Sequence, residues 1–282
     1  MKNEENNDKK RHIRNKILVN CITAIRSLGT IAIVPIFMAG GALSAGFASI
    51  GFFATDFIDG FLARHLHVQS FFGSLLDGLS DKAFGIVCLL LLGTLNPLFF
   101  VIPLIELGIL AVNYKSIQRG NNAKSSIAGK AKTVLLAASI AGGFFSYAAP
   151  SLKEILNYIN ITSLDKILSM NPDILSTLFA VPTIAASLYV EKDYLDKAKK
   201  QDKEKEEELT QEAIEVIEKS GLVNPSLEEI DKKRKELLKQ REEVLELKSR
   251  EEIKHDLFDT EFYLEHRDDG IKRLLYKNKG SE

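Results

Sequence analysis

The feature that most constrains this chain is the separation of its apolar and charged residues into two regions. From about residue 17 to residue 190 the sequence is mostly apolar, whereas residues 191–282 are dense in Lys, Glu, Asp and Arg. The averages over all 282 residues, 45% hydrophobic and 27% charged with a net charge of -1, hide this division. A shift in composition this sharp predicts two regions rather than one mixed domain.

Six apolar stretches are long enough to cross a bilayer as helices, which takes about 20 residues each. They cover approximately residues 18–40, 44–66, 70–94, 97–116, 131–149 and 172–192. Turns are expected at Gly40-Gly41 and at Asn96-Pro97. The sequence therefore predicts an all-α fold, a six-transmembrane-helix bundle with a charged, mostly helical cytoplasmic C-terminal extension. The expected parts are an N-terminal arm (1–16), a six-helix domain (17–192) and a tail (193–282).

Lysines and arginines gather on one side of these six stretches. The basic residues of the N-terminal arm and of the connection between the fourth and fifth stretches are Lys9, Lys10, Arg11, Arg14, Lys16, Lys115, Arg119, Lys124, Lys130 and Lys132. The polar connection 150–171, with room for a short interfacial helix, has only Lys153 and Lys166. By the positive-inside rule both termini face the cytoplasm, and a bacterial cell membrane is the expected location. A soluble all-helical protein is the alternative.

Several other classes find no support in the composition. Lysines and glutamates alternate in the tail instead of forming a basic patch, so no nucleic-acid partner is expected. The N-terminus is too polar and acidic for a cleaved signal peptide. The two cysteines, Cys21 and Cys88, lack metal-ligand spacing and are expected to be buried free thiols.

Four aspartates lie within the second and third apolar stretches, where an unpaired charge costs at least ~2.5–3.5 kcal/mol. They are Asp56, Asp59, Asp77 and Asp81. Four neighbouring carboxylates would also repel one another, so something must compensate their charge. A divalent cation does so best, and ligands that are all oxygen atoms indicate Mg²⁺ or Mn²⁺ rather than zinc.

Helical spacing brings these carboxylates together. Asp56 and Asp59 are three residues apart and Asp77 and Asp81 four apart, so each pair shares one helix face. The two stretches are expected to be antiparallel and joined near residues 65–70. At a rise of about 1.5 Å per residue, Asp59 lies roughly 10 Å from that turn and Asp77 about 12 Å. The sequence therefore predicts one cation site between the two helices.

The residues around the aspartates form a motif, Asp56-x2-Asp59-Gly60-x2-Ala63-Arg64-x8-Gly73-x3-Asp77-x3-Asp81. At every fixed position it resembles the motif of the CDP-alcohol phosphatidyltransferases, and the resemblance covers approximately residues 13–192. It implies a six-helix membrane enzyme, usually a homodimer, which transfers a phosphatidyl group from CDP-diacylglycerol to an alcohol and releases CMP.

The same resemblance implies a role for each matching residue. Asp56, Asp59 and Asp77 would bind the metal, and Asp81 would lie near it as a further ligand and as the general base. The contacts to the CDP moiety would be Asp56, Gly60, Ala63, Arg64 and Gly73. The metal would neutralise the pyrophosphate, while the base takes the proton of the attacking hydroxyl.

Two further segments are similar to phosphatidylglycerophosphate synthases, which implies glycerol 3-phosphate as the acceptor. The segments are Asn20-x2-Thr23-x2-Arg26 and Gly129-Lys130-Ala131-Lys132-Thr133. Their polar residues would bind the acceptor phosphate, namely Asn20, Thr23, Arg26, Lys130 and Lys132. As an alternative, the two lysines serve only as positive-inside anchors.

The fourth stretch departs from this subgroup, whose members carry an Arg-Glu pair followed by another arginine. Here the glutamate aligns with Glu106, but the arginines align with Ile105 and Asn113. Arg119 is a candidate substitute from the following loop. Phosphatidylglycerol, which would give cardiolipin, and an inositol phosphate therefore stay open as acceptors.

The tail carries a helix-start pattern, Ser226-Leu227-Glu228-Glu229, after a turn at Gly221 to Pro225. It predicts a helix as far as about residue 255, either as a solvated extension or as a docking or dimer-supporting element. Two other functions remain possible for the chain. It could be a non-catalytic membrane scaffold that acts through the tail, or a transporter or channel, although no inverted repeats are visible.

Overall fold

The computed structural model describes residues 2–66, 68–119, 127–221, 224–266 and 270–279. Within these ranges, the side chains at positions 2–13, 15–20, 22–27, 56–57, 59–60, 63 and 270–271 lie outside the described part. The chain divides into two compact units. We call them the bundle (Met1–Leu110 and Ser125–Glu191) and the tail unit (Ala111–Lys124 and Lys192–Glu282).

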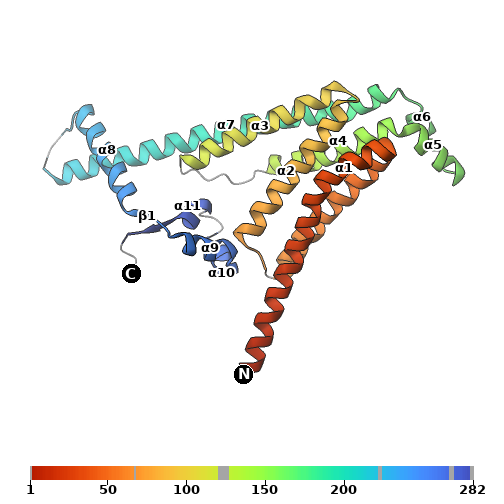
Figure 1. Ribbon diagram of the computed structural model, residues 1–282. Coiled ribbons are helices and arrows are strands. Elements are labelled where there is room, and N and C mark those ends of the chain that lie inside the picture. The colour runs from red at the N-terminus through yellow and green to blue at the C-terminus, as the bar shows by residue number, and fades with distance from the viewer. Residues whose placement is uncertain (1, 67, 120–126, 222–223, 267–269, 280–282) are drawn as a thin grey trace. The chain divides into compact units, whose positions relative to one another are not determined.

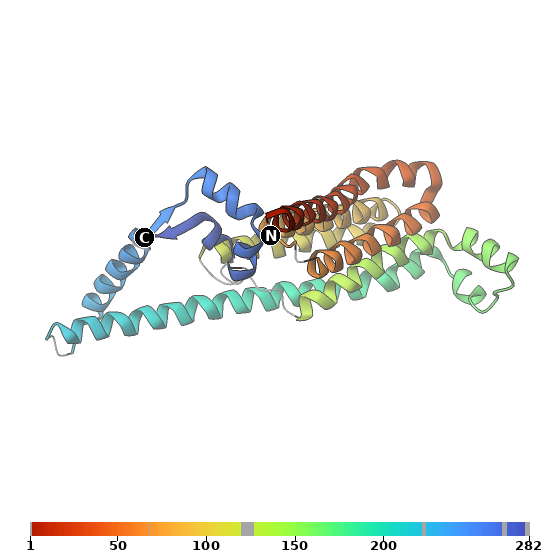
Figure 2. The same ribbon diagram turned by 90° about the horizontal axis from the view of Figure 1, so that it is seen from below.

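Helix α1 (Lys2–His65) is a hairpin of two helical arms, because Gly41 interrupts it. Gly41 has a φ of 65°, a left-handed conformation that residues with a side chain rarely adopt. The turn predicted at Gly40-Gly41 is thereby confirmed. The two arms run side by side in both views (Figures 1 and 2). A Cβ at Gly29 of the first arm would overlap the Phe52 ring of the second, so this glycine permits the close approach.

Helix α2 (Phe71–Gly93) follows the hairpin and packs against its second arm. A short 3-10 helix, η1 (Pro97–Phe100), then leads into α3 (Val101–Gln118), and α4 (Ile127–Tyr147) follows. The turn predicted at Asn96-Pro97 is confirmed, and the Asn96 side chain accepts the Leu98 N–H at 3.1 Å. Asn96 also donates to Ser176 at 3.0 Å, which ties this turn to the start of α7.

The hydrophobic core of the bundle draws on every long apolar helix. Its fully buried large residues include Ile33 of α1, Phe84 of α2, Ile102 of α3 and Phe144 of α4. The outward faces are also apolar. Leu28, Ile31, Met38, Leu104, Val134, Leu178 and Leu188 are each at least half exposed. Apolar groups on both the inside and the outside of a bundle suit a lipid surrounding.

Four helices within the described residues are long and apolar enough to cross a membrane. They are Leu28–Thr55 of α1, Pro97–Gln118, α4 and the apolar part of α7 (Pro172–Lys219). The sequence predicted six. The difference has two sources: α1 counts once although Gly41 bends it, and α2 carries Asp77, Asp81 and Lys82 in its middle.

Two short helices, α5 (Ala149–Tyr158) and α6 (Asp165–Leu168), form the connection from α4 to α7. The predicted sixth stretch ends near residue 192, but α7 continues without a break to Lys219 and so belongs to both units. Of the two cysteines, Cys88 is buried as expected. Cys21 is exposed on α1, so the expectation of a buried thiol is wrong there.

The tail unit contains α8 (Leu227–Glu243), β1 (Leu245–Leu247), α9 (Arg250–Phe258), α10 (Thr260–His266), α11 (Gly270–Leu275) and β2 (Tyr276–Asn278). The predicted capping box of α8 is confirmed, since Ser226 and Glu229 bond to each other's backbone. The helix predicted to reach residue 255 is wrong, because Leu245–Leu247 pairs antiparallel with Tyr276–Asn278. Ser249 then caps a new helix, α9, through a second capping box with Glu252.

Candidate functional site

The four motif aspartates lie on two adjacent helical segments, the second arm of α1 and the first half of α2. Asp56 and Asp59 are helical positions of α1, near its end at His65. Helix α2 begins at Phe71 because the buried Ser70 caps it, accepting the Gly73 N–H at 3.1 Å. Asp77 and Asp81 follow within the next three turns of this helix.

The register between the two segments follows from the contact of Phe52 and Phe53 with Phe84, with ring centroids 5.1 and 5.5 Å apart. At about 1.5 Å per residue, position 56 lies about 6 Å from position 52 toward the turn between the helices. On α2, position 81 lies about 4.5 Å from position 84 in the same direction. Position 59 lies about 10.5 Å from position 52, and position 77 about 10.5 Å from position 84, both toward the same turn. The backbone thus holds position 56 level with 81, and position 59 level with 77.

The first arm of α1 carries the polar segment Asn20-x2-Thr23-x2-Arg26, which lies toward the same end of the bundle as the aspartates. Gly29 lies against Phe52, so counting from Gly29 places position 26 about 4.5 Å and position 23 about 9 Å toward the same end of the bundle. These are the positions of Arg26 and Thr23, and Asn20 lies one turn further. Their side chains lie outside the described residues, as do those of Asp56, Asp59, Gly60 and Ala63.

The described side chains of the motif are accessible from outside the bundle. Asp77 and Asp81 are half-buried, Gly73 is half-buried and Arg64 is exposed. Where side chains are described, no group of three or more His, Cys, Asp or Glu forms a metal cluster. Since two of the four expected ligands are not among them, the metal centre stays a prediction. An all-carboxylate donor set at matched levels fits a hard divalent cation.

The two lysines of the α4 start differ sharply in their surroundings. Lys130 is exposed. Lys132 is buried, and its ammonium forms an ion pair with the carboxylate of Glu106 on α3, with side chains only 9% and 11% exposed. The positive charge of Lys132 therefore has a protein partner before any acceptor binds.

Arg119, the candidate substitute from the loop, lies in the tail unit. Its guanidinium pairs with Asp202 of α7 at 2.6 Å, and Lys205 donates to the Arg119 carbonyl at 3.0 Å. Burial, followed by the charge of Lys272, lowers the pKa of Lys205. Arg119 is thus held by α7, and the structure gives no placement of it against the motif aspartates.

Glu106 is the functional candidate whose importance the sequence reading missed. In the sequence, Glu106 only matches the glutamate of the subgroup's Arg-Glu pair, and this match gives it no role of its own. The available signal was its isolation, since it is the one charged residue between Pro97 and Tyr114. An ionisable residue within a membrane span usually has a partner facing the bundle interior, and here that partner is Lys132.

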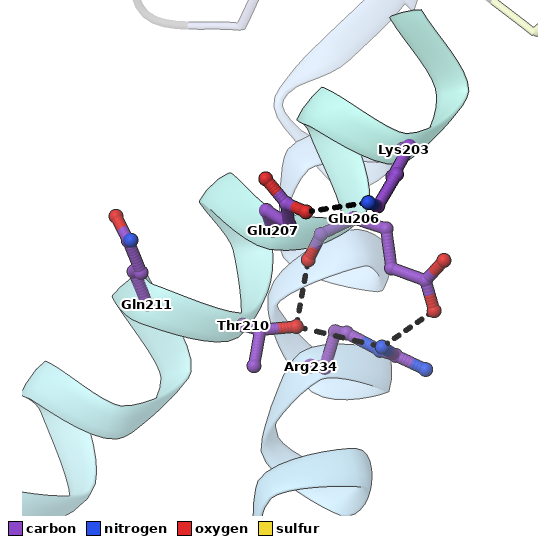
Figure 3. A pocket seen from close by; sticks show the side chains of 6 residues that line it. All are labelled: Lys203, Glu206, Glu207, Thr210, Gln211 and Arg234. Atoms are coloured by element: carbon purple, nitrogen blue, oxygen red, sulfur yellow. Dashed lines mark hydrogen bonds and ion pairs between the residues drawn. The ribbon is translucent and has the colours of Figure 1, made fainter. Parts of the chain in front are cut away.

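A pocket of about 480 Å³ lies in the tail unit between α7 and α8 (Figure 3). Its charged side chains already pair with each other: Arg234 bonds to Glu206 at 2.9 Å, and Lys203 lies 3.6 Å from Glu207. Leu209 and Ala213 of α7 and Leu237 of α8 form a small apolar cluster between the same two helices. The pocket is a gap along a helical hairpin and contains none of the motif residues.

The comparison with protein families agrees with the motif. The profile of the CDP-alcohol phosphatidyltransferases matches residues 16–164, which include all four aspartates, part of the first arm of α1 and the whole of its second arm. Among curated proteins, no sequence matches this chain. Because the family match covers more than half of the 282 residues, the chain belongs to the CDP-alcohol phosphatidyltransferase family.

Proposed function

We propose that the chain transfers the phosphatidyl group of CDP-diacylglycerol to glycerol 3-phosphate, giving phosphatidylglycerophosphate and CMP. Membership of the family implies an integral membrane transferase of phospholipid synthesis that uses an alcohol acceptor and releases CMP. The observation that carries the residue assignment is the register of α1 and α2. It sets positions 56 and 81 at one level and positions 59 and 77 at another.

In this proposal Asp56, Asp59, Asp77 and Asp81 hold Mg²⁺ or Mn²⁺. The cation would supply charge neutralisation for the pyrophosphate and for the departing CMP. Asp81 accepts the proton of the acceptor hydroxyl as its oxygen attacks the β-phosphorus. The new P–O bond forms as the bond from that phosphorus to CMP breaks, and no covalent enzyme intermediate is needed.

The CDP moiety is held by the remaining motif positions. Asp56, Gly60, Ala63 and Gly73 would line its site, with small residues leaving space between the two helices. Arg64 is exposed near the end of α1, where its planar guanidinium can form paired hydrogen bonds with a phosphate. This assignment predicts that Arg64 contributes to binding of the donor lipid rather than to proton transfer.

The acceptor site is proposed to combine Asn20, Thr23 and Arg26 of α1 with Lys130 of α4, and Lys132 and Arg119 as further candidates. Two ion pairs affect which of these residues can attract an acceptor phosphate. Glu106 neutralises Lys132, and Asp202 neutralises Arg119, so Lys130 and Arg26 would carry most of the attraction for an acceptor phosphate. Phosphatidylglycerol and inositol phosphate stay as alternative acceptors, because Ile105 and Asn113 stand where the phosphatidylglycerophosphate synthases have arginines.

We further propose six spans, with the N- and C-termini in the cytoplasm of a bacterial cell, and a homodimer as the working form. The bend at Gly41 and the helical continuity of α2 support the six-span count. Cysteine labelling from either side of sealed vesicles tests the orientation. Light scattering of the purified protein in detergent tests the dimer.

The decisive experiment supplies CDP-diacylglycerol with Mg²⁺ or Mn²⁺ and compares glycerol 3-phosphate, phosphatidylglycerol and inositol phosphate as acceptors. CMP should appear with glycerol 3-phosphate, disappear on chelation of the metal and return when metal is restored. CMP with none of the three would favour the scaffold reading. That reading also requires function to survive Asp77→Asn but to be lost when the tail is removed from Lys200 onward.

A further inference from the structure

The connection between α4 and α7 leaves one candidate span and returns into another at the same end of the bundle. Helix α4 ends at Tyr147, and α5 begins at Ala149 with Pro150 in its first turn, so the chain bends at Ala148. Tyr147 donates a hydrogen bond of 2.5 Å to Asp173 in the first turn of α7. The two ends of the connection are therefore held together.

This end of the bundle is the one opposite the turn between α1 and α2. The rings of Phe47, shortly after the Gly41 bend, and Phe145 of α4 lie 5.2 Å apart. The Tyr147 hydroxyl also lies 3.1 Å from the Leu95 carbonyl oxygen, which places the α2–η1 turn here. Figure 2 shows α5 and α6 beyond this end of the bundle. The segment thus lies where spanning helices reach a membrane surface.

Helix α5 has one apolar and one polar face. Its apolar residues Leu152, Ile155 and Leu156 recur at the helical spacing i, i+3 and i+4, and Ile159, directly after the helix end, continues the pattern at i+7. The polar residues Lys153, Glu154 and Asn157 fall on the opposite side. Of the apolar face, Ile155 is 48% and Ile159 54% exposed, whereas Leu152 and Leu156 are half-buried. Tyr158 at the edge of this face is 89% exposed.

The exposed apolar surface continues past α5 through α6 into the start of α7. Its members are Ile161, Leu164, Ile167, Met170 and Ile174, each between 37% and 57% exposed. Hydrogen bonds at α5 and the end of α6 stabilise the fold of this segment. Lys153 donates to Ser169 at 2.8 Å, and Ser169 donates to the Asp165 carbonyl at 2.7 Å. The apolar groups are therefore displayed on a folded element.

We propose that α5 and α6 lie in the bilayer interface, with the face Leu152, Ile155, Leu156 and Ile159 in contact with lipid. A helix of ten residues is about 15 Å long, half the thickness of the hydrocarbon core, so α5 does not span the bilayer. The adjoining spans fix it at the membrane surface, where such a face meets acyl chains and the polar face meets water. Tyr158 at the boundary suits the headgroup level.

The chain contains no tryptophan, so a single introduced tryptophan reports on its own position. Ile159→Trp probes the apolar face, and Asn157→Trp on the polar face of the same helix is the matched control. Both variants, in the full-length protein, are placed in nanodiscs of phosphatidylcholine and phosphatidylglycerol, with or without brominated acyl chains. Iodide serves as the aqueous quencher.

We expect Ile159→Trp to emit at shorter wavelength than Asn157→Trp and to lose most of its emission in brominated bilayers, while iodide quenches Asn157→Trp far more strongly. Ile155→Trp repeats the test if the first variant does not fold. Equal quenching of both faces by iodide would overturn the proposal in favour of a solvated loop. Protection of position 159 from both quenchers would overturn it in favour of a protein partner, such as a second copy of this chain.

Discussion

The ion pairs of the bundle and those of the tail unit differ in how far water reaches them. Within α3 and α4 of the bundle charged groups are few, and the Glu106–Lys132 pair is nearly excluded from solvent. In the tail unit, most ion pairs run along the helix surfaces, as between Arg241 and Glu212 or Lys203 and Glu207, whose side chains are each at least a third exposed. The pair Lys248–Asp256, with side chains 12% and 15% exposed, is more buried than these. The Glu106–Lys132 pair is thus shielded from water, whereas most ion pairs of the tail are screened by it.

The difference has an energetic consequence that can be measured. An exposed ion pair contributes about 0–1 kcal/mol, because water screens it and two long side chains lose freedom. Removing one partner of a buried pair costs about 3–5 kcal/mol, because the other charge is left without compensation. Substitutions of similar chemistry should therefore have very different effects in the two units.

The largest effect is expected for the carboxylates of the proposed metal site. Asp81→Asn should lower the rate of CMP release by about 10²–10⁴-fold, because the general base is lost. Asp196→Asn, at an exposed aspartate on the tail part of α7, should leave the rate unchanged. Release of CMP from CDP-diacylglycerol measures both. Equal rates for the two variants would mean that Asp81 takes no part in the reaction.

Glu106→Leu should lower the free energy of unfolding by about 3–5 kcal/mol, since it leaves the Lys132 ammonium buried without a partner. Unfolding in detergent, followed by heat or denaturant, measures the change. The double variant Glu106→Leu with Lys132→Leu should recover most of the loss, because no lone charge remains. If the double variant were as unstable as the single one, packing rather than charge would explain the effect.

In the tail unit the corresponding change should be small. Arg241→Gln removes ion pairs to Glu212 at 2.6 Å and Glu208 at 3.6 Å, all well exposed. We expect a loss of about 0.2–1 kcal/mol, which added salt reduces further. The same unfolding measurement applies, at low and high salt. A loss as large as that of Glu106→Leu would contradict the contrast between the two units.

The smallest effect should come from pH at the start of α8. The Ser226 backbone N–H and hydroxyl donate to Glu229 and hold the pKa of its carboxyl below the ordinary value. The charged form therefore stabilises the capping box at neutral pH, and this contribution is lost as pH falls through the lowered pKa. Hydrogen exchange at the first turn of α8, corrected for intrinsic rates, should show this step. Glu229→Gln, which does not ionise, should abolish it, whereas Ser226→Ala should only make it smaller, because the backbone N–H of residue 226 remains.

Much of the fold follows from local sequence signals. Apolar length predicted the long helices, and the glycine pair at residues 40–41 predicted the bend, because only glycine adopts its backbone conformation without cost. The Ser226 capping box predicted the start of α8 to the residue. Helical spacing alone also predicted that the four aspartates occupy matched levels on two antiparallel segments.

What the sequence did not reveal depends on contacts between distant residues. The helix expected to reach residue 255 ends at Glu243, because residues 245–247 find a strand partner about thirty residues later. Likewise, nothing local shows that Lys132 faces Glu106 or that Arg119 faces Asp202. These pairings changed the interpretation of the acceptor site more than any helix boundary did.

The Glu106–Lys132 pair also bears on how the protein is inserted during synthesis. The ribosome delivers Glu106 first, and Lys132 follows 26 residues later on the next helix. Until then Glu106 lacks its ion-pair partner, and an unpaired charge in a span costs ~2.5–3.5 kcal/mol on insertion scales. Lys82 of α2, whose charge also acts on Glu106, offsets only part of this cost. We therefore expect the insertion machinery to retain α3 until α4 arrives and to release both as one hairpin. The ion-pair partner of Glu106 thus lies on the next helix of the same nascent chain.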